Sequence, residues 1–165
     1  KILDKNKTNE QLVQNIDITP TVLDVCQIET SNKRNIDGKS LLPLLTNEVQ
    51  SIHDALFFEY GWTRAMRTKR WKYIALRYSK STDKLRSERG VLYHARSLVP
   101  MQHEVLLSHP NYWDANQLYD LSIDAGETTN LAGDIEYKET LTMMKTKLGE
   151  WLKTFSNHPF GEFTE

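Results

Sequence analysis

Cysteine is nearly absent from this 165-residue sequence: Cys26 is the only one, which excludes an internal disulfide and a cysteine-rich metal cluster. No stretch approaches the roughly 18 consecutive apolar residues of a membrane span, so we expect none. Net charge is also lacking, since 21 Lys and Arg residues against 22 Asp and Glu residues leave a formal charge of −1. Without a strong basic field, the chain is not expected to bind nucleic acid or an anionic membrane.

What is present is the composition of a folded domain. Hydrophobic residues make up 39% of the chain and aromatic residues 10%, which is too rich for a disordered chain. The length suits one domain with a core of its own. The chain begins at Lys1 without an initiator methionine or a signal peptide, so we expect the natural N-terminus to lie elsewhere.

Two helical segments are predicted near the N-terminus. Thr19 is a suitable N-cap, and Pro20 suits the first position of a helix. The apolar face of this helix consists of Val22, Leu23, Val25 and Cys26. We therefore expect Cys26 on or near a buried face, where thiols are usually inert packing groups. Residues 41–45, around Pro43, predict one further helical turn lying on a core.

After residue 55 the pattern changes to that of an antiparallel sheet. Four strands are predicted, at residues 55–60, 63–67, 71–78 and 117–121. Short connections join the first three, and such strands pair antiparallel because parallel neighbours need a long crossover. A final helix begins after Asp134, with an apolar stripe formed by Tyr137, Leu141, Met144, Leu148, Trp151, Leu152 and Phe155. The fold class is therefore α+β, a small antiparallel sheet of about four strands packed against a long C-terminal helix.

Three stretches, in this order, resemble formylglycine-dependent sulfatases of the alkaline phosphatase superfamily. The first is NIDITPTVLD at residues 15–24, followed by DGKSLLPLL at residues 37–45. The second is RAMRTKRWKYI at residues 64–74. The third is QLYDL at residues 117–121, followed by NLA at residues 130–132. The chain is most similar to the C-terminal portion of bacterial arylsulfatases and polysaccharide sulfatases.

The resemblance implies two parts in the chain. Residues 1–50 would be the tail end of an α/β catalytic domain, and residues 51–165 the C-terminal subdomain of antiparallel sheet and helix. The parent enzyme would need Ca²⁺ and a formylglycine made from Cys or Ser in a C/S-x-P/A-x-R motif. Cys26 is followed by Gln-Ile-Glu-Thr and does not match that motif. The chain thus supplies no cofactor site, catalytic residue or metal ligand of the family, and alone it is expected to be inactive.

The resemblance also implies a function and partners. The parent would be a sulfuric ester hydrolase that cleaves sulfate esters, on a sulfated polysaccharide or glycan. This chain would give structural support and part of the substrate pocket, packed against the missing N-terminal catalytic domain. Family habit places such enzymes in the periplasm or outside the cell. The sequence does not name the substrate.

Five residues are candidates for contact with substrate. Trp62 and Arg64 follow a predicted strand end, where an aromatic face can stack on a sugar and a guanidinium can grip a sulfate. The interpretation that we favour is the other one, in which Trp62 packs and Arg64 is a solvated strand residue. His94, Arg96 and His103 lie in an irregular, imidazole-bearing stretch typical of binding loops. The histidine spacings do not match a zinc pattern.

Acidic residues near the QLYDL phrase allow two interpretations. Asp120, Asp124 and Glu127 could suggest a cation site. Carboxylates in turns more often accept hydrogen bonds from backbone N–H groups, and we favour that role.

Two hypotheses for the whole chain make different structural predictions. As a sulfatase fragment, residues 1–50 should expose apolar surface that a missing sheet once covered. As a free-standing carbohydrate-binding or scaffolding module, it should bury Leu12, Ile16, Ile18 and the helix of Pro20 on its own sheet. The first hypothesis is the leading one.

Overall fold

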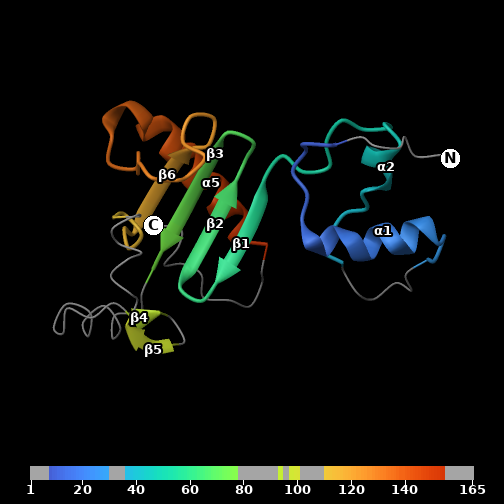
Figure 1. The fold of residues 1–165 in the computed structure, drawn as a ribbon, viewed down its shortest axis with the longest axis horizontal. Coiled ribbons are helices and arrows are strands. Elements are labelled where there is room, and N and C mark those ends of the chain that lie inside the picture. Colours follow the sequence, from blue (N-terminus) through green and yellow to red (C-terminus); the bar gives the residue numbers. More distant parts are fainter. Residues whose placement is uncertain (1–7, 30–35, 78–92, 95–96, 101–109, 155–165) are drawn as a thin grey trace. The chain divides into compact units, whose positions relative to one another are not determined.

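The computed structural model describes residues 8–29, 36–77, 93–94, 97–100 and 110–154 (Figure 1). The chain forms two compact units, Lys1–Leu56 and Phe57–Glu165. Within the described ranges, none of the helices is both long and apolar enough to cross a membrane.

The N-terminal unit contains short helical elements. These are the 3₁₀ turn η1 (Asn15–Asp17), helix α1 (Ile18–Val25) and the single turn α2 (Leu42–Leu45). The turn at α2 is confirmed, with Leu44 buried. Helix α1 begins one residue before Thr19, because η1 leads directly into it and Asp17 occupies the N-cap position. The predicted N-cap at Thr19 is therefore wrong.

The apolar face of α1 is not buried. None of its residues is buried, and Val22 and Val25 expose 54% and 59% of their surface. Cys26, directly after the helix, is also exposed, so the expectation of a buried thiol is wrong. Amphipathic spacing identified the apolar side of this helix correctly, but the described part of the chain provides nothing to cover it.

The C-terminal unit is built on a four-stranded antiparallel sheet of order β1-β2-β3-β6 (Figure 1). The strands are β1 (Leu56–Tyr60), β2 (Thr63–Arg67), β3 (Trp71–Leu76) and β6 (Asn116–Asp120). All four predicted strands are confirmed, with ends within about two residues. Met66 of β2 lies opposite Tyr73 of β3, which lies opposite Leu118 of β6. A second, two-stranded sheet pairs β4 (Tyr93–His94) with β5 (Ser97–Pro100), in a stretch where the sequence showed no clear pattern.

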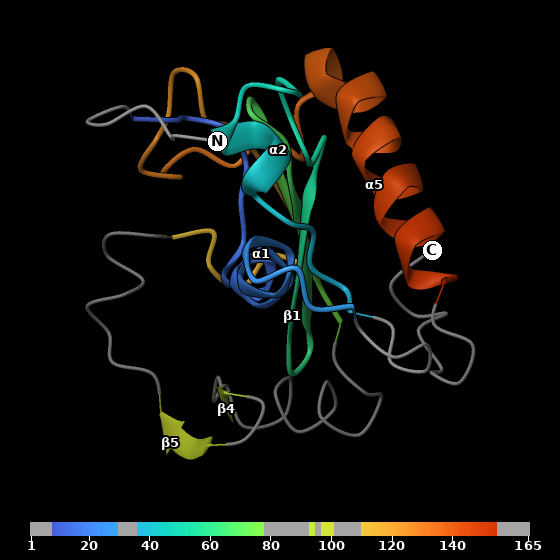
Figure 2. The same ribbon diagram turned by 90° about the vertical axis from the view of Figure 1, so that its right-hand side faces the viewer.

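Helix α5 (Lys138–Leu152) packs along the sheet and closes the core of this unit (Figure 2). Its Met144 and Leu148 are fully buried, as are Met66, Tyr73 and Leu118. These three strand residues share one face because they are direct cross-strand partners. The predicted α+β fold, an antiparallel sheet with a long C-terminal helix, is confirmed.

Aromatic contacts and a cap fix the two ends of α5. The 3₁₀ turn η2 (Ile135–Tyr137) precedes it, and the Asp134 carboxylate accepts from the backbone N–H of Glu136 over 2.9 Å. At the other end, Trp151 stacks on Phe57 of β1 with ring centroids 4.7 Å apart and an interplanar angle of 7°. Stacking of this kind adds to the area that the rings bury. The first strand and the last helix of the unit are therefore joined directly.

The tight turn between β2 and β3 carries an ion pair to β6. Arg70 donates to both carboxylate oxygens of Asp120, with Nη2 to Oδ2 at 2.8 Å. Its guanidinium also lies 4.7 Å from the ring centroid of Trp71. Asp120 is almost completely buried, and the hydrogen bonds from Arg70 are the main reason that its pKa is lowered to about 2.

Removing the arginine should weaken the sheet modestly. In Arg70→Ala we expect the free energy of unfolding at neutral pH to fall by about 1 kcal/mol, because the Arg70 side chain is 60% exposed and water screens the pair. The difference from wild type should shrink as pH falls from 3.8 to about 2, where Asp120 takes up a proton in the folded state. Urea unfolding across a pH series measures this. The exposed Arg67→Ala is the control, and equal losses in both variants would contradict the assignment.

Candidate functional site

One end of the four-stranded sheet gathers the β1–β2 turn, the end of β3 and the start of β6. Gly61 and Trp62 form the turn, and Gly61 has a φ of 53°, in the region that favours glycine. The carbonyl oxygen of Trp62 accepts from the backbone N–H of Arg77 over 3.0 Å. The N–H of Leu76 donates to the carbonyl oxygen of Ala115 at the same distance. We call this region the Trp62 end of the sheet.

Arg64 is buried at this end. Its Nη1 donates to the carbonyl oxygens of Gly61 and Thr63, both over 2.9 Å, and its Nη2 donates to Glu59 Oε1 over 2.7 Å. Only 5% of Arg64 is exposed, so the favoured interpretation of a solvated strand residue is wrong. These contacts let the guanidinium brace the β1–β2 turn. A contact of Arg64 with substrate stays a prediction. So does a contact of the half-buried Trp62 with substrate.

A second network at the same end joins β3 to β6. The hydroxyl of Tyr73 donates to Asn116 Oδ1 over 2.8 Å, and Nη2 of Arg77 donates to the same oxygen over 2.9 Å. Burial raises the pKa of Tyr73, which keeps its hydroxyl protonated as a donor. No separate sequence signal predicted this network, because its residues become neighbours only when β3 and β6 pair.

The structure describes the backbone of one of the three remaining predicted site residues. His94 belongs to strand β4. Arg96 and His103 lie outside the described residues. Trp62 and Arg64 lie near the same turn because they are two residues apart, and a role of any of the five residues in substrate binding stays a prediction.

Carboxylates near the end of β6 are engaged with protein groups. Asp124 accepts hydrogen bonds from the backbone N–H groups of Thr128 and Thr129. The bond from Thr128 has the larger effect, and together the two bonds lower the pKa of Asp124 although burial acts to raise it. Glu127 pairs with Nζ of Lys72 over 2.6 Å. For Asp124 this is the backbone-accepting role that we favoured over a cation site, whereas the ion pair of Glu127 with Lys72 was not predicted. In the ranges that the structure describes, no group of three or more His, Cys, Asp and Glu side chains is arranged to hold a metal ion.

The N-terminal unit contains a buried carboxylate that sequence reasoning missed. Asp17 is fully buried, and Oδ1 accepts from the N–H of Lys39 over 2.8 Å. Oδ2 accepts from the N–H of Gln14 over 2.7 Å and from Nε2 of His53 over 2.9 Å. Burial acts to raise the pKa of Asp17, but the hydrogen bonds from Lys39, Gln14 and His53 outweigh it and the pKa is lowered. Its place inside the NIDITP phrase was the only signal available.

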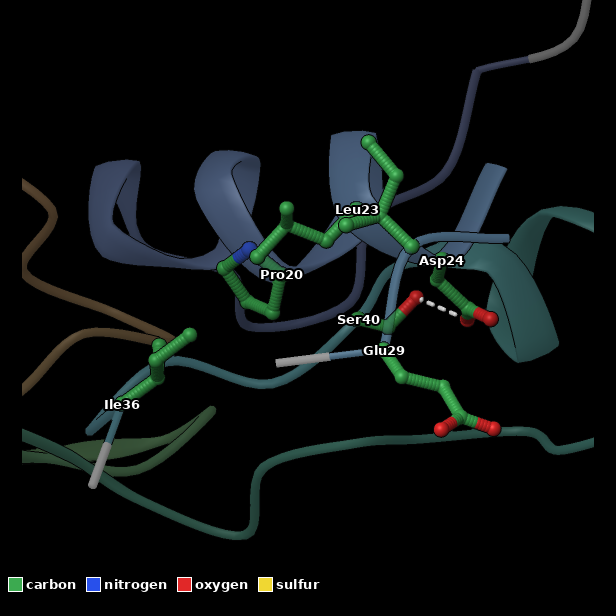
Figure 3. Close-up of a pocket in the computed structure, with 7 residues that line it drawn as sticks. Pro20, Leu23, Asp24, Glu29, Ile36 and Ser40 are labelled. Atoms are coloured by element: carbon green, nitrogen blue, oxygen red, sulfur yellow. Dashed lines mark hydrogen bonds between the residues drawn. The ribbon is translucent and has the colours of Figure 1, made fainter. Parts of the chain in front are cut away.

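A shallow pocket of about 480 Å³ also lies in this unit, between α1 and the segment that follows residue 36 (Figure 3). Its lining combines apolar and acidic side chains: Pro20, Leu23, Asp24, Ile28, Glu29, Ile36 and Ser40. One wall is fixed by the Ser40 hydroxyl, which donates to Asp24 Oδ2 over 2.6 Å. The lining residues that the structure describes include no cation that could bind a sulfate.

Known proteins are similar to this chain along most of its length. The family model described as N-sulphoglucosamine sulphohydrolase, C-terminal, matches residues 1–87. Two ulvan-active sulfatases of Formosa agariphila are 27% identical over 169 residues and 24% identical over 163 residues. These alignments cover 91% and 93% of this chain but only 27% and 31% of the relatives. The chain therefore spans less than a third of the length of the curated relatives that it matches.

Solved structures share the fold. A 2-O GAG sulfatase matches with a TM-score of 0.53 and 23% identity, over 84% of this chain and 24% of that chain. A putative sulfatase from Bacteroides thetaiotaomicron has a TM-score of 0.53 and 22% identity, over 84% of this chain and 24% of that chain. A phosphonate monoester hydrolase of Agrobacterium radiobacter has a TM-score of 0.53 and 21% identity, again over 84% of this chain and 24% of that chain. At these identities the likeness shows the fold alone, and enzymes named for different esters have it.

Proposed function

The chain belongs to the N-sulphoglucosamine sulphohydrolase C-terminal family, and on that premise we propose that it is the C-terminal part of a sulfuric ester hydrolase acting on a sulfated polysaccharide or glycan. The observation that carries the proposal is the alignment of more than nine-tenths of this chain with less than a third of two ulvan-active sulfatases. Their polysaccharide substrate favours a sulfated glycan here. By the same resemblance, the protein would work in the periplasm or outside the cell.

The surface of the N-terminal unit supports this proposal. Among the residues of this unit that the structure describes, nine large apolar side chains are exposed: Val13, Ile16, Ile18, Val22, Val25, Ile28, Ile36, Leu45 and Val49. An apolar surface of this extent indicates an interface. The fragment hypothesis predicted it, with the rest of a catalytic domain as the partner.

The competing hypothesis of a free-standing carbohydrate-binding module is less well supported. It predicted burial of Leu12, Ile16 and Ile18. Leu12 is buried, whereas Ile16 and Ile18 expose 43% and 57% of their surface.

The two groups that the family needs for catalysis do not fit the described residues. A Ca²⁺ ion needs several free oxygen ligands, and the buried carboxylates of Asp17 and Asp120 are already engaged with protein donors. The only cysteine lies outside a modification motif. The proposed role of this chain is therefore to support the catalytic domain and, through Trp62 and Arg64, to line the outer substrate pocket.

The test is an assay of sulfate release from an aryl sulfate and from a sulfated polysaccharide, with added Ca²⁺. The 165-residue chain should be inert. The full-length protein, matured to carry formylglycine, should be active, and the same protein with the motif cysteine or serine replaced by alanine should not. Sulfate release by the short chain, or an inactive mature full-length protein, would overturn the proposal.

A further inference from the structure

Strand β6 is the last strand in the sheet order, so one side of its backbone faces away from β3 (Figure 1). A strand edge of this kind is a template for pairing with another chain unless something covers it. Here the chain that follows β6 returns to its outer side. The N–H of Leu118 donates to Asn130 Oδ1 over 2.9 Å, and the carbonyl oxygen of Leu118 accepts from the N–H of Leu131 over 2.8 Å. Both main-chain groups of the central residue of β6 are therefore occupied from outside the sheet.

The side-chain amide of Asn130, in the NLA phrase, takes the place of a neighbouring strand. Its Oδ1 accepts from the N–H groups of Leu118 and Ala132, over 2.9 and 3.0 Å. Its Nδ2 donates to the carbonyl oxygen of Asn116 over 3.0 Å and to Asp114 Oδ2 over 2.8 Å. A primary amide has two acceptor and two donor positions, so this amide is completely used. Like a peptide group, it offers β6 an acceptor and a donor side by side.

Residues 124–132, which we call the strap, are held less firmly than β6 itself. Glu127 pairs with Nζ of Lys72 over 2.6 Å, and both side chains are partly exposed. The φ of Glu127 is 56°, which is uncommon for a residue other than glycine and costs free energy. The ladder of β3 and β6, in contrast, continues without interruption along the whole of β6. We therefore expect the strap to open at a lower free-energy cost than the ladder.

We propose that the strap closes the β6 edge through Asn130, and that an open strap lets β6 pair with β6 of a second copy of this chain. A strand edge is complementary to itself, because two antiparallel copies related by a twofold axis exchange the same N–H and C=O groups. Charge does not oppose this pairing, since Asp120 is the only charged residue of β6 and Arg70 offsets its charge over 2.8 Å. The device lies within the C-terminal unit and does not depend on the proposed hydrolase function.

The test compares Asn130→Ala with Asn111→Ala in the complete 165-residue chain. Asn111 is the matched control, because its side-chain amide also donates to Asp114 Oδ2, over 2.9 Å, but not to the β6 backbone. Light scattering over a concentration series measures self-association. Asn130→Ala should associate about tenfold more tightly than wild type, the effect of uncovering the two β6 groups that the amide binds. Asn111→Ala should behave like wild type, and equal association of the two variants would overturn the proposal.

Hydrogen exchange locates the surface and does not depend on the folding of a variant. In the wild-type chain at low urea, the N–H groups of Leu118 and Ala132 share one acceptor, so they should exchange together and before the amides of the β2–β3 ladder. In Asn130→Ala, exchange at Leu118 should slow as protein concentration rises, because a second copy covers that N–H. Exchange of the wild-type Leu118 N–H only on global unfolding, or exchange in Asn130→Ala that is independent of concentration, would contradict the device.

Discussion

Asp17→Ala should be among the most destabilising single substitutions in this chain, with a loss of about 3–5 kcal/mol from the N-terminal unit. The carboxylate is fully buried and accepts three hydrogen bonds, from Gln14, Lys39 and His53. Alanine would leave two backbone N–H groups and an imidazole N–H buried without an acceptor, and each such group costs about 1–3 kcal/mol. Urea unfolding, with hydrogen exchange of the N-terminal unit, measures the loss.

The pH dependence identifies the carboxylate as the cause. Because the folded-state pKa of Asp17 lies below its ordinary value of 3.8, its contribution is fully present above pH 3.8 and is lost as pH falls through the folded-state pKa. Asp17→Asn should remove this pH dependence along with the stability. Asp24→Asn, which changes an exposed carboxylate on the following helix α1, is the control and should change stability little. A similar loss in Asp24→Asn would contradict the assignment.

Gly38→Ala should destabilise the same unit by about 1–3 kcal/mol, the usual cost of forcing extra atoms into a filled space. A Cβ at this position would lie 2.1 Å from the carbonyl oxygen of Ile16 and 3.0 Å from the backbone nitrogen of Asp17. Both are main-chain atoms, so no side chain can rotate away. A shift of the backbone at residue 38 would move the N–H of Lys39 away from the Asp17 carboxylate. The effect of Gly38→Ala is therefore coupled to that of Asp17→Ala.

Gly133→Ala is the matched control for this prediction. A Cβ at Gly133 would have no atom within 4 Å, so the substitution should leave stability nearly unchanged. Thermal melting of the two variants and the wild type makes the comparison. If Gly38→Ala melts together with Gly133→Ala, the close packing of residue 38 against Ile16 is not present in solution.

The sheet and α5 were predictable because their signals are local. The run from residue 63 to residue 76 alternates side-chain types around a tight turn, and this pattern fixes both strands and their pairing. The stripe on α5 likewise predicted the burial of Met144 and Leu148. Local periodicity suffices where an element finds its partner within the same unit.

The errors and omissions arise where a partner is distant or absent. Periodicity marked the apolar side of α1, but it cannot tell whether the described chain covers that side, and Cys26 was misplaced for this reason. Asp17 was missed because its donors come from three separate segments. The pairing of Arg77 with Asn116 depends in the same way on a strand far along the chain.

The stacking of Phe57 on Trp151 has a consequence for biosynthesis. A ribosome releases the β2–β3 hairpin early, and its two strands can pair as soon as both are out. Strand β6 and the last turn of α5, which cover Tyr73 and contact Phe57, emerge only after the hairpin is complete. Until then the apolar face of the hairpin is exposed to chaperones and can aggregate. A stop codon before Trp151 should therefore give a product that is degraded rather than a smaller stable protein.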